Sequence, residues 1–184
     1  MTRDRDPAGR PRNARPRDAL GRPLDPAGGP GSGAAGTDRI PDDLVITGAE
    51  AAALADRLLR DGRPFHAHEV LEAAWKSGPS GERDLWQGLA QIAVGLTHAR
   101  RGNARGAVSL LRRGAARVRG SEARVGSEAG AGSETAMGRS ARPFGMDIAS
   151  FLAATDELAV RIERDGLDGI PSADLSPGLL ASRP

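Results

Sequence analysis

An imidazole and a carboxylate that could do chemistry together lie at His68 and Glu72, four residues apart. On a helix, side chains at this spacing are neighbours on one face. Phe65 and Trp75 fall on the same arc as this pair, so the spacing predicts that His68 and Glu72 point inward. A polar pair in that position costs free energy unless it finds hydrogen-bond partners. We therefore expect a polar cluster inside the fold, with the neighbouring His66 and Glu69 on the outer side of the helix.

A metal centre is one chemistry that such a cluster could support. The metalloprotease pattern His-Glu-x-x-His would need a histidine where Glu72 stands. The pair His66 and His68 cannot chelate from a helix, because residues two apart lie on different faces. A site in which His68, Glu72 and His98 converge from two helices is the metal arrangement that the sequence leaves open.

A structural role is the main alternative for the same residues. A buried hydrogen bond between Glu72 and His68, supported by Gln87 or Gln91, would fix the packing of two helices. General acid–base chemistry by the same pair is a third interpretation. The sequence favours the structural one, and zinc or manganese titration by calorimetry would separate it from a metal site.

The helix that would face this pair carries no charged residue between Leu85 and Ala99. On a helical wheel, Gln87, Gln91 and His98 fall together on one side, and a broad apolar face lies on the other. Most of its circumference is therefore expected to be covered, which predicts a central position in the bundle. Gly88 and Gly95 border the polar stripe, and we expect them to permit close approach of another helix.

Five segments have helical spacing of apolar residues, and nothing alternates with the period of a strand. The predicted helices lie between Thr47 and Gly62 and at about 65–77, 82–101, 104–119 and 146–164. Thr47 and Glu50 form a capping-box pattern at the first start, and Gly102-Asn103 separates the third and fourth helices. So short a link forces an antiparallel helical hairpin. The sequence predicts an all-α fold, a compact bundle of about five helices around a central hairpin.

The flanks differ in composition from this helical region. Residues 1–40 are rich in Pro, Gly and Arg and nearly free of apolar side chains, which predicts a disordered tail. The stretch 120–143 reads as a flexible Gly/Ser-rich insertion within a helical domain at 41–166. The remaining residues, 167–184, are interrupted by prolines and are predicted to form a second disordered tail.

Three motifs in the helical region resemble a known family. Segment 68–75 has the pattern His-Glu-x-x-Glu-x-x-Trp, segment 86–93 contains Gln-Gly-Leu, and segment 101–107 contains Gly-Asn-x-x-Gly-Ala. Over residues 60–119 the chain resembles the bacterial family DUF309, a domain of unknown function. The resemblance implies a compact all-α fold and supplies no reaction. The positions of the family pattern in this sequence are His68, Glu69, Glu72, Trp75, Gln87, Gly88, Gln91, His98, Gly102, Asn103 and Gly106.

An arginine-rich strip offers a different function class. From Arg100 to Arg119 the sequence contains arginines and no acid, and such a face could hold phosphate groups. The alternative is a solvated helix face, and the strip lacks aromatic residues for base stacking. The candidate anion-binding residues are Arg105, Arg112, Arg113 and Arg117.

Composition narrows the remaining classes. The 184 residues include no cysteine, which excludes disulfides and thiolate metal sites, and the formal net charge is only +2. No apolar run reaches the length of a membrane span or a secretory signal, so a cytoplasmic location without membrane contact is expected. We expect a binding or interaction module rather than an enzyme. A metal-dependent hydrolase that uses the His-Glu-x-x-Glu helix and nucleic-acid or anion binding are the alternatives. No cofactor is predicted outside the metal alternative, and the expected partner is a protein or a second copy of the chain.

Overall fold

The computed structural model describes residues 18, 20–22, 40–41, 44–129 and 142–180, with side chains of the fourth helix described up to residue 122. The α-helices are α1 (Gly48–Arg60), α2 (Pro64–Ser77), α3 (Arg83–Arg100), α4 (Ala104–Ala129) and α5 (Ile148–Asp165). Short 3-10 turns lie at Ser80–Glu82, Pro143–Gly145 and Ser172–Leu175. The described residues contain no strand beyond one isolated bridge between Met146 and Leu180. The prediction of an all-α bundle of five helices is confirmed.

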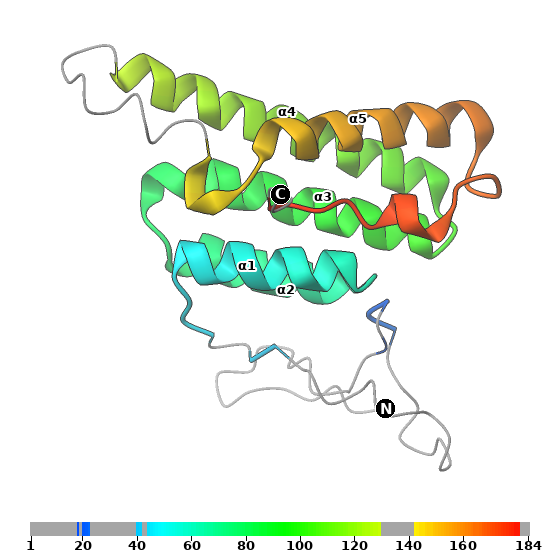
Figure 1. The fold of residues 1–184 in the computed structure, drawn as a ribbon, viewed down its shortest axis with the longest axis horizontal. Coiled ribbons are helices and arrows are strands. Elements are labelled where there is room, and N and C mark those ends of the chain that lie inside the picture. Colours follow the sequence, from blue (N-terminus) through cyan, green and yellow to red (C-terminus); the bar gives the residue numbers. More distant parts are fainter. Residues whose placement is uncertain (1–17, 19, 23–39, 42–43, 130–141, 181–184) are drawn as a thin grey trace, which may run out of the picture.

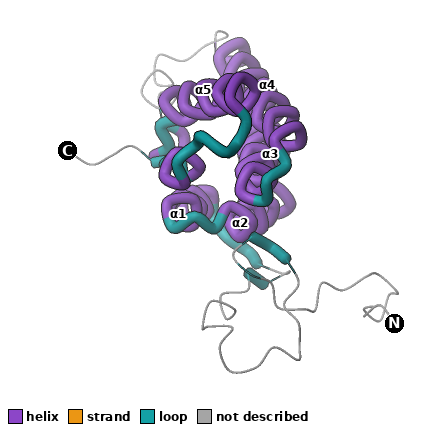
Figure 2. Tube along the Cα trace, turned by 90° about the vertical axis from the view of Figure 1, so that its right-hand side faces the viewer, coloured by secondary structure: helices purple, strands orange, loops and turns teal. Residues whose placement is uncertain are grey.

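The helices form layers with α3 in the middle. Figures 1 and 2 show α1 and α2 on one side of α3, and α4 and α5 on the other. α3 packs most extensively against α4 and next against α2, while α5 packs against α4. The uncharged stretch of α3 explains this position, because a helix covered on two sides can keep few charged side chains.

The ends of the helices follow the predicted signals. Thr47 caps α1 in a capping box, in which the Glu50 amide donates to Thr47 Oγ1 and Glu50 Oε2 accepts from the Thr47 amide. Gly102, with φ of +79°, ends α3. The side chain of Asn103 then accepts a hydrogen bond from the Gly106 amide at 2.9 Å. Three residues therefore turn α3 back into α4, and the predicted central hairpin is confirmed.

The α3–α4 contact depends on two glycines that face each other. A Cβ on Gly88 would lie 2.9 Å from the carbonyl oxygen of Gly114, and a Cβ on Gly114 would lie 2.7 Å from that of Gly88. No side chain fits between backbones this close, so only glycine is accommodated at either position. This contact confirms the prediction that Gly88 permits close approach of another helix.

α4 is longer than the sequence predicted. The helix continues to Ala129, about ten residues beyond the expected end and into the predicted 120–143 insertion. Ser121 is still buried, and its hydroxyl donates to the Val118 carbonyl at 2.7 Å. The glycine and serine content was therefore a poor guide, because packing against the bundle carries the helix past Gly120. Residues 130–141 of the insertion lie outside the described residues.

The C-terminal segment also differs from its prediction. Residues 167–180, which we call the C-terminal strap, run across the middle layer between α1 and α5 instead of leaving the fold (Figures 1 and 2). Leu179 is fully buried, and its amide donates to Asp56 Oδ1 of α1 at 2.6 Å. The Leu180 amide donates to the same oxygen at 2.9 Å. Residues 181–184, and all of the predicted N-terminal tail except residues 18, 20–22 and 40, lie outside the described residues.

Candidate functional site

A pocket of about 180 Å³ lies between α2 and α3, with one lining residue from α4. We call it the α2–α3 pocket. His68, Glu72 and Trp75 are one turn apart on α2, and Gln87 and Gln91 are one turn apart on α3. The two polar rows therefore face each other across the helix pair. The full lining is His68, Glu72, Trp75, Gln87, Ala90, Gln91, Val94 and Leu110.

Glu72 is the acidic centre of this pocket. One carboxylate oxygen lies 2.8 Å from Lys76 Nζ, and the other lies 3.5 Å from His68 Nε2. The carboxylate is only one-third exposed, whereas the Lys76 side chain is 62% exposed. Glu72 therefore stays accessible from the pocket, while its lysine partner extends into solvent.

The surroundings of the His68 imidazole favour its neutral form. Burial lowers the pKa of His68 below its ordinary value of 6.5 and outweighs the raising effect of Glu72, and Lys76 lowers this pKa further. A neutral ring has one donor and one acceptor nitrogen. Because Nε2 is the atom beside the Glu72 carboxylate, the proton is favoured there, which leaves Nδ1 as an acceptor.

Two buried polar atoms in the lining have no hydrogen-bond partner among the described residues. They are His68 Nδ1 and Gln91 Oε1. Gln87 differs, because its Oε1 accepts from Arg117 Nη1 at 2.7 Å, and the same nitrogen donates to Asp84 at 2.9 Å. One glutamine is thus fixed by the bundle and the other is left with an unused acceptor.

The structure brings together His68, Glu72, Trp75, Gln87 and Gln91, which the sequence had grouped. It does not add His98, whose Nδ1 lies 2.8 Å from Asn103 Nδ2 at the end of α3. Glu69 is half-buried and is not part of the pocket lining. Among the described residues, no group of three or more His, Cys, Asp or Glu side chains could hold a metal ion. The arrangement of His68, Glu72 and His98 as one metal site is therefore not formed.

The interpretation of His66 as an outward residue is wrong. The His66 side chain is 4% exposed, and its ring lies edge-on to Phe65 with centroids 5.7 Å apart. α2 packs against α1 as well as α3, so its buried surface extends around two sides of the helix. His66 is one turn from the buried Val70 and belongs to this wider buried surface. The prediction from helical spacing had allowed for only one buried face of α2.

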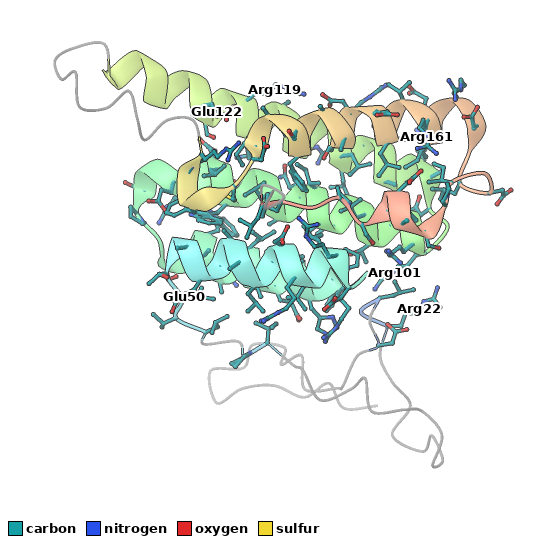
Figure 3. All side chains as sticks on the ribbon, in the orientation of Figure 1. Arg22, Glu50, Arg101, Arg119, Glu122 and Arg161 are labelled. Carbon is teal, nitrogen blue, oxygen red and sulfur yellow. The ribbon has the colours of Figure 1, made fainter. Side chains whose placement is uncertain are left out.

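The arginine strip of α4 is largely paired with acids of other helices. Arg112 binds Glu163 of α5 with two hydrogen bonds, and Arg117 binds Asp84 of α3. Arg119, labelled in Figure 3, pairs with Asp156. Arg113 donates to Ser109 Oγ, and the exposed Arg105 lines a second cavity of about 430 Å³ between α4 and α5. The sequence alone suggested an unpaired positive strip, because the acids that pair with these arginines come from distant segments of the chain.

At the end of α3, Arg100 and Arg101 bind other parts of the chain. Arg100 donates to Ser172 and Ser176 of the C-terminal strap. Arg101, which Figure 3 labels near Arg22, donates to the Leu20 carbonyl.

The sequence did not indicate three residues that line the α2–α3 pocket, namely Ala90, Val94 and Leu110. Their apolar side chains carried no signal that distinguished them from ordinary core residues.

Lowering the pH below about 6.5 is expected to reduce stability through His68. The folded-state pKa lies below the unfolded value of 6.5, so between the two the unfolded chain binds a proton that the folded chain does not. Urea unfolding at about pH 7.5 and about pH 5.5 checks this by comparing the wild type with His68→Gln. The wild type should lose more stability than the variant, which retains the other two histidines. Equal losses would contradict a lowered pKa at His68.

Comparisons with known proteins now test the resemblance. Residues 53–110 match the family model "Domain of unknown function (DUF309)". The chain is also 46% identical over 48 residues to the uncharacterized protein YpuF of Bacillus subtilis, an alignment that covers 26% of this chain and 28% of that protein. No solved structure matches. The resemblance to DUF309 is confirmed over this region, which contains every residue that lines the α2–α3 pocket.

Within the described residues, no helix is both long and apolar enough to cross a membrane.

Proposed function

We propose that the DUF309-like region is a binding module whose α2–α3 pocket receives a small polar group. The observation that carries this proposal is the pair of unpartnered buried acceptors, His68 Nδ1 and Gln91 Oε1, on residues that line one open cavity. Leaving a buried polar atom unsatisfied costs roughly 1–3 kcal/mol, so a group that enters the pocket and reaches either atom after a small rotation of its side chain recovers part of that free energy.

The size of the pocket limits what it takes. Drug-sized molecules occupy pockets of roughly 300–1,000 Å³, and this one measures about 180 Å³. A head group with a short stem fits this volume, either as part of a small molecule or as a side chain of a protein partner. The metal-dependent hydrolase has less support, because His98 is paired with Asn103.

Filling the pocket tests the proposal. Ala90 is a buried lining residue of α3, and Ala90→Met places three additional heavy atoms at its wall. Ala104 lines the separate cavity between α4 and α5, so Ala104→Met is a matched control. Ligand-observed NMR with methylguanidinium, acetamide, acetate and methyl phosphate provides the readout. We expect at least one probe to bind the wild type and the Ala104→Met variant, and not the Ala90→Met variant.

Thermal unfolding shows whether Ala90→Met still folds. If it does not, Gln91→Leu replaces it, because this change removes the unpartnered acceptor at nearly constant volume. Binding that survives both variants, or the absence of binding by every probe, contradicts the proposal.

A further inference from the structure

We infer that the α2–α3 pocket selects a cationic head group with several N–H donors, of the guanidinium or amidinium class. This inference rests on the proposed binding function and names the chemistry of its ligand. It follows from two features of the lining, the hydrogen-bonding roles of its buried atoms and the sign of its charge, and Lys76 beside the pocket supplies its test.

Both unpartnered buried atoms, which belong to residues of the lining, accept hydrogen bonds. Gln91 Oε1 is a carbonyl oxygen. His68 Nδ1 is the acceptor of a neutral ring whose other nitrogen lies 3.5 Å from the Glu72 carboxylate. Two acceptors separated across a helix pair are satisfied by a group that donates in more than one direction. A guanidinium does so, because its five N–H donors lie in a fixed plane.

The charge of the lining favours a cation. Glu72 is the one carboxylate among the lining residues, and no lysine or arginine belongs to the lining. A hydrogen bond to a charged partner is roughly twice as strong as one between neutral groups, so Glu72 adds affinity for a donor that is itself positive. An anion would instead be repelled by the Glu72 carboxylate.

The rest of the lining suits the stem of such a group. Ala90, Val94 and Leu110 provide apolar walls on α3 and α4. Trp75 lines the pocket from α2 and is half-buried. An indole attracts cations through its ring face, and it also packs well against methylene groups. An alkyl chain that ends in a guanidinium therefore finds both apolar and polar partners here.

Lys76 supplies the sharpest test of this ligand class. Its ammonium lies 2.8 Å from Glu72 and competes with any incoming cation for that carboxylate. Removing Lys76 should therefore strengthen the binding of a cation, whereas the same change would weaken the binding of an anion. Since the side chain is mostly exposed, Lys76→Ala is expected to fold like the wild type.

The experiment measures the affinity of methylguanidinium and acetate by NMR titration of the full chain. We expect Lys76→Ala to tighten methylguanidinium binding about threefold and Glu72→Gln to weaken it on the order of tenfold, as expected for loss of a charge-assisted hydrogen bond. Arg113→Ala is the matched control, because it removes one positive charge from an exposed site on α4 and should leave the affinity unchanged. A capped Gly-Arg-Gly peptide distinguishes the source of the group. Tighter binding of the peptide supports a protein partner's arginine, and equal binding supports a free small molecule.

Acetate binding tighter than methylguanidinium, or Lys76→Ala weakening methylguanidinium, overturns the inference. Pocket-dependent binding of acetamide, acetate or methyl phosphate without any binding of methylguanidinium also overturns it and leaves the proposed function standing. If none of the probes binds, both fail together.

Discussion

Gly114→Ala is expected to lower the free energy of unfolding by about 2 kcal/mol, because it over-packs the contact between α3 and α4. The new Cβ would lie 2.7 Å from the Gly88 carbonyl oxygen, 2.7 Å from an Ile92 side-chain carbon and 2.9 Å from the Ile92 amide nitrogen. Two of these three atoms belong to the backbone of α3. They cannot move by a change of rotamer, so the two helices must separate.

Gly120→Ala is the matched control in the same helix. A Cβ on Gly120 would meet nothing within 4 Å, so this variant should gain up to about 1 kcal/mol from helix propensity. Urea unfolding of the two variants and the wild type measures both changes. Equal effects of the two substitutions would contradict a close contact at Gly114.

Asp56→Ala is expected to destabilise the chain by about 3 kcal/mol, because it removes the anchor of the C-terminal strap. Asp56 Oδ1 accepts from the amides of Leu179 and Leu180 at 2.6 and 2.9 Å, and Oδ2 accepts from Arg60 Nε at 2.9 Å. Hydrogen bonds to a charged group are each worth roughly 1.5–3 kcal/mol. Water can form hydrogen bonds with the released amides in the variant, so the loss of unfolding free energy is smaller than the sum over the three hydrogen bonds.

Detachment of the strap distinguishes this effect from general damage to α1. Limited proteolysis of Asp56→Ala should cleave within residues 167–180 at a protease concentration that leaves the wild type intact. Asp61→Ala removes an exposed acid at the end of the same helix and should behave like the wild type. Cleavage spread evenly over the helices, or no increase in cleavage, would argue against the strap as the element that Asp56 holds.

The fold could be predicted from the sequence because its signals are local. Thr47 and Glu50 satisfy the first amides of α1 from within one turn. The link Gly102-Asn103 reverses the chain with a positive φ and a side-chain cap, and both depend on residue type alone. Where the signal was compositional, as at Gly120 and Ser121, the prediction was wrong, because burial of Ser121 outweighed the weak helix propensity of the segment.

The strap could not be predicted because what holds it is far away in the chain. Leu179 and Leu180 form a short leucine pair among prolines and serines, and the acceptor of the Leu179 amide is Asp56, 123 residues earlier. The same reason applies to the arginines of α4, whose acids come from α3 and α5. Ion pairs between different helices produce no periodic pattern in a single sequence, so they could not be predicted from it.

The candidate site was partly accessible to sequence reasoning. The i, i+4 spacing of His68 with Glu72 and of Gln87 with Gln91 was enough to place four side chains on two facing rows. His98 was included because it lies on the same side of the wheel as Gln91, two turns further along α3. A helical wheel of this segment does not include Asn103, whose side chain forms a hydrogen bond with His98 Nδ1.

The separation between Asp56 and its strap partners has a consequence for biosynthesis. At roughly 5–20 residues per second, a ribosome needs on the order of ten seconds to deliver Leu179 after it has made Asp56. During that interval the Asp56 carboxylate lacks both strap amides, and Arg60 of its own helix is the partner already synthesised within four residues. The strap can therefore join α1 only after all five helices have been synthesised.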